Sequence, residues 1–242
     1  MELQVQSVQT LRVQVRPDVA HNNGELEIDL YGPLTSNPVF LLHGGGQTRH
    51  AWSSTGLRLQ RAGYCAVAVD LKGHGNSYWD PAGNYTHQSY AQDILRLASH
   101  LGSQVKPVLV GASLGGLTST EAVGMAPERV LSLVLVDISP RLEPQGVSRV
   151  INFMTRNVRE GFDSLDEVFM AVQSYTPNRH REKNLDSLMK NVRLRGGRYY
   201  WHWDPKTLSN SPGHHREDAL WDCLAKFSGL HSPLPGVQLR VT

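Results

Sequence analysis

One stretch of the chain places a single serine between glycines, at the junction of two expected elements. The β-branched run Val108–Val110 favours a buried strand, and the apolar spacing of Leu114–Val123 favours a helix packed behind a sheet. Gly111 and Gly115 stand two residues before and after Ser113, as a G-x-S-x-G turn requires where backbones approach closely. The pattern predicts that the Ser113 hydroxyl stands above the sheet as a nucleophile. The alternative is a tight connection without chemistry.

A second glycine-rich segment follows the short apolar strand expected over Pro38–Leu42. Such a loop brings backbone N–H groups close to a ligand, either as a phosphate loop or as an oxyanion hole. No Gly-Lys-Ser/Thr sequence follows, which favours the oxyanion hole. We expect the N–H groups of Leu114 and Gly45 to bind the oxyanion, with Gly46 as the next candidate donor. His43, at the same strand end, is a candidate substrate contact.

The turn that follows the buried strand expected over Tyr64–Leu71 contains an acid and a histidine. Asp70 and His74 could form a pair for proton transfer. Gly73 and Gly75 indicate a sharp turn, however, and Asp in such turns commonly caps the backbone. We therefore favour a structural role for this turn.

The remaining patterns predict how these loops are positioned. Strands alternate with helices along the first part of the chain, which predicts an α/β fold with a mostly parallel sheet and helices on both faces. In such a sheet the ligand site lies at the C-terminal strand ends, where His43, Ser113 and Asp137 fall. The other expected elements are a leading hairpin over Leu11–Val15 and Glu25–Tyr31, helices over Arg49–Gln60 and Ser89–Leu101, and a strand over Val130–Ile138.

Four ordered motifs in this region resemble the α/β-hydrolase fold superfamily, closest in appearance to its esterases, lactonases and cofactor-free haloperoxidase-like members. The motifs are the glycine loops at 43–46 and 70–77, the serine turn at 111–115 and the strand end at 135–137, and the resemblance is strong over residues 10–140. It implies no cofactor and no metal. A serine at this turn, where dehalogenases of the superfamily have aspartate, implies acyl transfer from an ester, thioester or lactone. Asp137 is then a candidate catalytic acid, with capping or packing as the alternative.

Residues 141–215 differ in composition from the first 140 residues and resemble the inserted helical lid of family members. Amphipathic spacing predicts helices over Ile151–Val158, Leu165–Tyr175 and Leu185–Val192. Side chains that could line the substrate pocket, or else pack the lid against the core, are Phe153, Met154, Phe169, Met170, Trp201 and Trp203. His202, between two tryptophans, is expected to be a packed ring.

Residues 216–242 are expected to return to the core. A helix is predicted over Glu217–Phe227, and Pro235–Val241 reads as the start of a further strand. The resemblance implies a catalytic histidine after one more strand, which this sequence does not supply, so the chain is expected to be C-terminally incomplete. His214 and His231 both precede the last strand-like run, and either would need a changed topology to act as the base.

Three hypotheses remain open from the sequence. Ser113 could carry out hydrolysis of a small carbonyl substrate, the chain could be a homologue that binds a small molecule without turnover, or it could be a truncated product without activity. Labelling of Ser113 tests the first hypothesis, saturable ligand binding without product release tests the second, and the intact mass of the native protein tests the third.

The amino-acid composition limits the kinds of molecule that the protein is expected to bind. The 242 residues, with 40% hydrophobic content, can form a large domain, and a net charge of +2 gives no reason to expect nucleic acid. Cys65 and Cys223 have no metal-binding spacing, and neither a signal peptide nor a membrane-spanning run is apparent. We expect a cytoplasmic protein with a small-molecule substrate, no nucleic acid and no membrane contact. The oligomeric state is left open.

Overall fold

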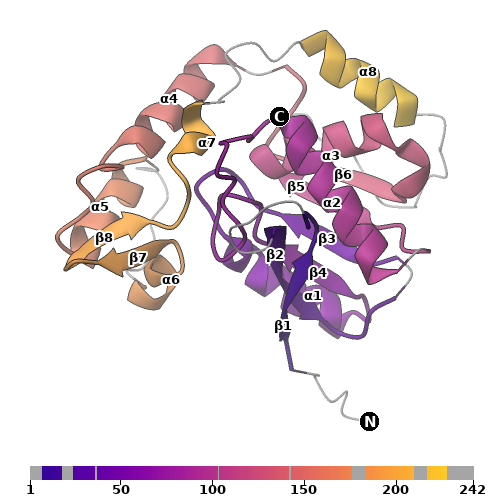
Figure 1. The fold of residues 1–242 in the computed structure, drawn as a ribbon, viewed down its shortest axis with the longest axis horizontal. Coiled ribbons are helices and arrows are strands. Elements are labelled where there is room, and N and C mark those ends of the chain that lie inside the picture. Colours follow the sequence, from indigo (N-terminus) through magenta and orange to yellow (C-terminus); the bar gives the residue numbers. More distant parts are fainter. Residues whose placement is uncertain are drawn as a thin grey trace.

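The computed structural model describes residues 7–17, 24–35, 37–102, 104–141, 143–175, 184–209 and 217–227. A six-stranded sheet with the order β1-β2-β4-β3-β5-β6 forms its centre (Figure 1). The first two strands form the predicted antiparallel hairpin, and β2 also pairs antiparallel with β4, whereas β4, β3, β5 and β6 run parallel. The strands are β1 (Gln9–Gln14), β2 (Glu25–Tyr31), β3 (Val39–Leu42), β4 (Ala66–Val69), β5 (Val108–Ala112) and β6 (Ser132–Val136).

Helices cover both faces of this sheet, as predicted. Every residue of β3 and β4 is buried, and successive side chains alternate between two apolar clusters because side chains on a strand point to opposite faces. One cluster includes residues of α2 (His87–Leu101), α3 (Leu114–Met125) and α8 (Glu217–Phe227). The other packs against the 3-10 turn η2 (Arg49–Trp52) and α1 (Ser53–Arg61). None of the helices in these described ranges is long and apolar enough to cross a bilayer.

Between β6 and α8 lies a segment that we call the cap, with described residues 143–175 and 184–209, seen to one side of the sheet in Figure 1. Besides helices, the cap contains a two-stranded antiparallel hairpin, β7–β8, which the sequence analysis did not predict. Its elements are α4 (Pro144–Thr155), α5 (Leu165–Tyr175), α6 (Leu185–Met189), β7 (Val192–Arg195), β8 (Arg198–Trp201) and α7 (Lys206–Ser209).

The hairpin has a clear local cause. Gly196 and Gly197 both have positive φ, at 54° and 79°, which is the backbone that a two-residue hairpin turn requires. The aromatic run Tyr199–Trp201 that follows suits a strand. The helix expected over Leu185–Val192 therefore ends at Met189.

Backbone hydrogen bonds join the cap to the turn after β4. Gly75 N–H donates to the carbonyl of His202 at 2.8 Å, and Asp204 N–H donates to the carbonyl of Gly73 at 2.7 Å. The intervening residues His74 and Trp203 form an antiparallel β-bridge. This side of the cap is thus paired with the core through main-chain bonds. The expected strand at 235–241, together with His214 and His231, lies outside the described residues.

Candidate active site

Ser113 occupies a strained turn between β5 and α3. Its backbone has φ 47° and ψ −112°, an unusual conformation for a residue with a side chain, and Ser113 is the N-cap residue of α3. The residue is exposed. The predicted geometry, with the serine raised at the end of a central strand, is therefore present.

Three glycines make this turn possible by close approach. A Cβ on Gly111 would lie 2.3 Å from the carbonyl oxygen of Gly115, and a Cβ on Gly115 would lie 2.3 Å from that of Leu42. At Gly116 a Cβ would lie 2.3 Å from Cγ2 of Ile138. Ile138 is distant in the chain, so the G-x-S-x-G pattern does not predict this contact. These distances are too short for any real Cβ, so Gly111 is required by the turn itself and Gly115 by the neighbouring strand β3.

The loop after β3 lies against the serine, as expected. A Cβ on Gly44 would stand 3.5 Å from Cβ of Ser113, and Gly115 N–H donates to the carbonyl of His43 at 3.1 Å. The N–H groups of Gly45 and Leu114 meet no acceptor in the described part of the chain. They remain the two candidate donors for an oxyanion.

The structure does not support Gly46 as an oxyanion donor. Its N–H donates to Nε2 of His74 at 3.2 Å and is thereby occupied. His74 is fully buried, and Nδ1 of its ring lies 3.1 Å from the carbonyl oxygen of Lys72. With Nδ1 protonated and Nε2 accepting, the ring is a neutral imidazole. Burial, followed by the proximity of His43, lowers the pKa of His74 to about 3.

The structure also does not support His43 as a substrate contact, which its place at a strand end predicted. The ring is fully buried, with Nδ1 2.8 Å from the carbonyl oxygen of Gly44 and Nε2 accepting from Leu71 N–H at 3.0 Å. Burial lowers the pKa of His43 to about 4. Its ring meets that of His74 edge-on, with 5.0 Å between the ring centroids. The two buried imidazoles thus pack together beneath the glycine loop that follows β3.

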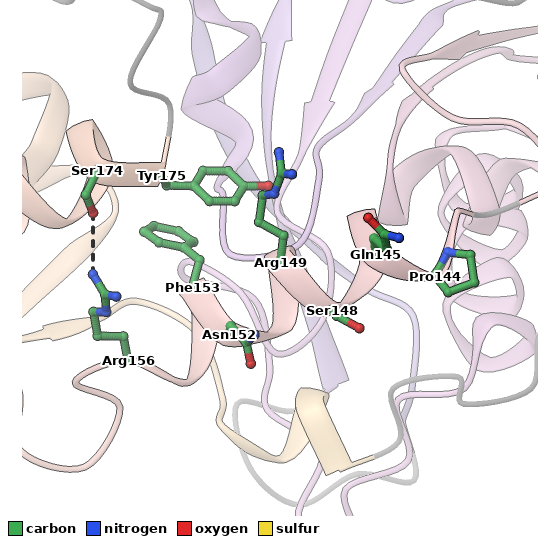
Figure 2. A pocket seen from close by; sticks show the side chains of 9 residues that line it. All are labelled: Pro144, Gln145, Ser148, Arg149, Asn152, Phe153, Arg156, Ser174 and Tyr175. Atoms are coloured by element: carbon green, nitrogen blue, oxygen red, sulfur yellow. Dashed lines mark hydrogen bonds between the residues drawn. The ribbon is translucent and has the colours of Figure 1, made fainter.

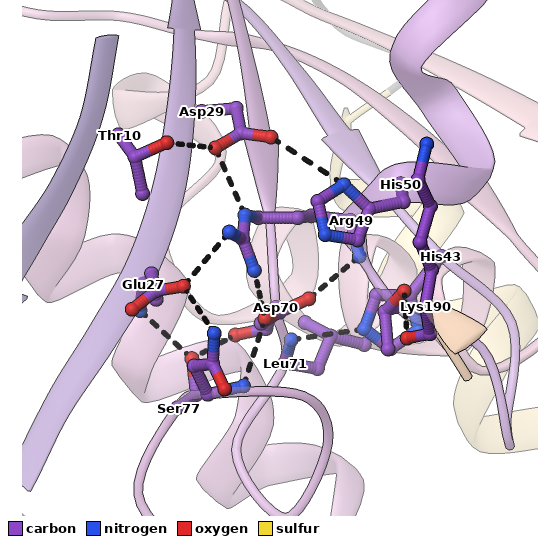
Figure 3. Close-up of polar contacts among 12 residues, drawn as sticks. Thr10, Glu27, Asp29, His43, Arg49, His50, Asp70, Leu71, Ser77 and Lys190 are labelled. Atoms are coloured by element: carbon purple, nitrogen blue, oxygen red, sulfur yellow. Dashed lines mark hydrogen bonds and ion pairs between the residues drawn. The ribbon is translucent and has the colours of Figure 1, made fainter. Parts of the chain in front are cut away.

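Asp70 has the structural role that the sequence favoured. Its carboxylate accepts from Arg49 N–H at 2.6 Å and from Asn76 N–H at 3.0 Å. Figure 3 shows the network around Arg49, whose guanidinium pairs with Asp70, Asp29 and Glu27 at 2.6, 2.9 and 2.8 Å. The network fastens η2, which follows the glycine loop, to β2 and to the end of β4.

Asp137 follows β6 directly beside the serine turn. Ala112 and Val136 are partners in the sheet, and Ser113 N–H donates to the carbonyl of Val136 at 3.4 Å. Asp137 is exposed and has φ 53°, so it shares the left-handed backbone of its neighbour Ser113. No described residue forms a hydrogen bond or ion pair with its carboxylate.

Two of the predicted cap residues lie over the glycine loop. Met154, which is buried, would be 3.6 Å from a Cβ on Gly45, and Trp203 Nε1 would be 3.7 Å from a Cβ on Gly46. Phe153 and Trp201 instead contact each other, with ring centroids 5.7 Å apart. Phe153 also stacks on Tyr175 at 4.4 Å.

A pocket of about 510 Å³ lies along α4 on the side of Phe153 (Figure 2). It is lined by Pro144, Gln145, Ser148, Arg149, Asn152, Phe153, Arg156, Ser174 and Tyr175. Within the described ranges, no group of three or more His, Cys, Asp or Glu residues is arranged to hold a metal ion.

A serine at a strained strand-to-helix turn, facing a glycine loop at the ends of parallel strands, matches a known family. A sequence profile of the alpha/beta hydrolase fold covers residues 37–214. The chain belongs to this α/β-hydrolase fold family. It is 34% identical over 195 residues to an esterase of Mycobacterium tuberculosis, which covers 76% of this chain and 60% of the relative. A crystal structure of the M. tuberculosis esterase superposes with a TM-score of 0.64 at 28% identity, covering 89% of this chain and 70% of the other.

A second relative is the pimeloyl-[acyl-carrier protein] methyl ester esterase of Vibrio parahaemolyticus. It is 32% identical over 143 residues, which are 56% of this chain and 52% of that protein. The chain thus spans between half and two thirds of the length of these two curated relatives. Within this α/β-hydrolase, no described residue forms a hydrogen bond with the Ser113 hydroxyl.

Proposed function

We propose that this α/β-hydrolase is a serine hydrolase that cleaves a small carbonyl substrate, an ester, thioester or lactone. The observation that carries the proposal is the exposed Ser113 on its strained turn, beside the N–H groups of Gly45 and Leu114, which have no acceptor among the described residues. The names of the two curated relatives, both esterases, support the same chemistry.

In the proposed reaction, Oγ of Ser113 attacks the carbonyl carbon and gives its proton to a general base. The electron pair of the C=O bond moves to oxygen, where the N–H groups of Gly45 and Leu114 stabilise the oxyanion. The alcohol or thiol then leaves with a proton from the conjugate acid of the base, and water hydrolyses the acyl-enzyme. His43 and His74 are buried with both ring nitrogens engaged, so neither is available as the base, and Asp137 is the proposed orienting acid for the residue that supplies it.

We also propose that the cap acts as a lid. Met154 and Trp203 reach the glycine loop from the cap, and their apolar side chains would exclude water from the oxyanion donors. Fewer competing water contacts strengthen each hydrogen bond to the developing charge.

Labelling with a fluorophosphonate tests the proposal directly. The wild-type protein and Ser54→Ala, which alters an exposed serine on α1, should be labelled, whereas Ser113→Ala should not. A series of p-nitrophenyl esters should show hydrolysis that Ser113→Ala reduces to the uncatalysed rate. Equal rates for wild type and Ser113→Ala, together with saturable ester binding, would favour the non-catalytic hypothesis instead.

A further inference from the structure

A buried ion pair joins the turn that follows β4 to helix α2. The side chain of Lys72 is fully buried, and its Nζ lies 3.7 Å from Oδ2 of Asp93, whose side chain is 2% exposed. The hydroxyl of Tyr78 donates to the same oxygen of Asp93 at 2.5 Å. Nζ also lies 5.4 Å from the centroid of the Tyr90 ring, within the range of a cation–π contact. The side chain of Lys72 therefore reaches from the turn to two residues of α2.

This pair is poorly arranged to stabilise the fold. Among the described residues, Nζ of Lys72, Oδ1 of Asp93 and the hydroxyl of Tyr90 form no hydrogen bond, although all three atoms are buried. Burial lowers the pKa of Lys72 and raises the pKa of Asp93, although each charge acts on the other in the opposite direction. The attraction between two such charges does not offset their loss of hydration, so the pair adds little net stability. The geometry points to a different role.

The main chain at Lys72 contacts both buried imidazoles and the cap. Leu71 N–H donates to Nε2 of His43 at 3.0 Å (Figure 3). The carbonyl oxygen of Lys72 itself lies 3.1 Å from Nδ1 of His74. The carbonyl of Gly73 accepts a backbone hydrogen bond from the cap at 2.7 Å. Three consecutive residues therefore hold the two rings and one side of the cap.

The position of this main chain affects the candidate oxyanion donors through His74. Nε2 of His74 accepts from the N–H of Gly46 at 3.2 Å, in the residue next to Gly45. A shift of the Lys72 carbonyl would therefore be passed through the His74 ring to the glycine loop. Groups that stabilise a transition state have to be held within about 0.5 Å of the productive geometry. The side chain of Lys72 fixes this main chain to α2.

We propose that the Lys72–Asp93 pair positions the glycine loop that follows β3, and that its charges serve turnover rather than stability of the fold. Lys72 and Asp93 act through His74 and not on the substrate, so both are positioning residues. The effect on turnover rests on the proposed function of Ser113, whereas the effect on the loop does not depend on hydrolysis.

A double variant without either charge tests the proposal. In Lys72→Met/Asp93→Asn, the asparagine keeps an acceptor for the Tyr78 hydroxyl. The midpoint of urea unfolding should stay close to the wild-type value. At the same time, kcat for p-nitrophenyl butyrate should fall about tenfold or more, with a smaller change in KM. A lowered midpoint with unchanged kcat would overturn the proposal. If the double variant does not fold, Asp93→Asn alone decides by the same two measurements.

Arg96 provides the matched control. Its Nη1 lies 3.8 Å from Oδ1 of Asp93, but its side chain is 44% exposed and comes from α2 itself. Arg96→Gln removes a cation from beside the same carboxylate without a change in the turn, so kcat should stay at the wild-type value. An equal fall in kcat for Arg96→Gln would assign the effect to α2 and overturn the role of Lys72.

Hydrogen exchange separates this inference from the proposed function. In Ser113→Ala protein, NMR follows exchange of the Gly46 amide, which the bond to His74 protects. Addition of Lys72→Met/Asp93→Asn should speed this exchange about tenfold or more and leave the amides of β4 unchanged. Faster Gly46 exchange together with an inactive wild type would support the positioning pair and contradict the proposed function. Unchanged Gly46 exchange would overturn the positioning pair, whether or not the wild type hydrolyses esters. This measurement also decides the case in which the urea midpoint and kcat fall together.

Discussion

The backbone N–H of Gly46 donates to Nε2 of His74, 28 residues further along the chain. This bond joins the glycine loop after β3 to the turn after β4. It fixes the direction of the peptide that follows Gly45, the candidate oxyanion donor. His74 is therefore a positioning residue in the proposed reaction.

Two substitutions of His74 distinguish the effect of its hydrogen-bond acceptor from the effect of its size. His74→Leu leaves the Gly46 N–H without a partner, and an unsatisfied buried donor costs about 1–3 kcal/mol. We expect kcat for p-nitrophenyl butyrate to fall about tenfold or more with a smaller change in KM. His74→Gln offers an amide oxygen to the same N–H and should recover part of kcat. If the Leu and Gln variants lose activity equally, the bond to Gly46 is not the cause.

Acid should destabilise the protein through its buried histidines. The pKa values of His43 and His74, about 4 and about 3, are depressed below the unfolded value near 6.5. The unfolded chain therefore binds more protons below pH 6.5, and the stability present above that pH is lost as pH falls toward the folded values. Each histidine should cost about 2 kcal/mol between pH 6.5 and 5.

Urea unfolding at a series of pH values measures this loss. His74→Gln should show a smaller decrease between pH 6.5 and 5 than the wild type, because the amide does not titrate. His100→Gln, a change at an exposed position, should retain the wild-type decrease. An unaltered decrease in His74→Gln would contradict the assignment.

The strained backbone at Ser113 predicts a gain in stability when the side chain is removed entirely. Positive φ at a non-glycine residue costs about 1–3 kcal/mol, whereas glycine adopts it freely. Ser113→Gly should therefore be about 1 kcal/mol more stable than Ser113→Ala by urea unfolding. On α1 the same comparison at Ser54 should have the opposite sign, because glycine weakens a helix. A less stable Ser113→Gly would show that the turn holds little strain.

Arg49 should contribute far more to stability than the other arginine of its network. Its side chain is 7% exposed, and Arg49→Leu would leave the buried carboxylates of Glu27, Asp29 and Asp70 without their cation. We expect a loss of about 3–5 kcal/mol in the free energy of unfolding. Arg12 pairs with Glu27 at the surface, where its side chain is 58% exposed, and Arg12→Leu should cost less than about 1 kcal/mol. Similar losses for both variants would contradict this ranking.

The parts of the fold that depend on local sequence were predicted correctly. The alternation of strands and helices and the serine turn between Gly111 and Gly115 are written in short segments, because periodicity and close backbone approach act over a few residues. The hydrogen bonds of Gly46 and His43 could not be predicted, for the opposite reason. Their partners, His74 and Leu71, are 28 residues away, and nothing in the loop itself marks its N–H or ring nitrogens as occupied.

The cap shows a signal that was present but overlooked. Gly196-Gly197 between Val192–Arg195 and Tyr199–Trp201 is a two-residue hairpin pattern, which the helical spacing of the preceding residues obscured. The lining of the pocket could not be predicted, because it depends on α5 bringing Tyr175 against Phe153. The positioning role of His74 likewise appears only when two loops are placed together.

The β-bridge between His74 and Trp203 has a consequence for exchange of parts between related enzymes. His74 pairs with the cap through its main chain and with the glycine loop through its ring. A cap transplanted from another hydrolase without its matching turn would disturb the peptide meant to receive the negative charge. Evolution or engineering of new substrate preference in this protein therefore has to change cap and turn as one inherited unit.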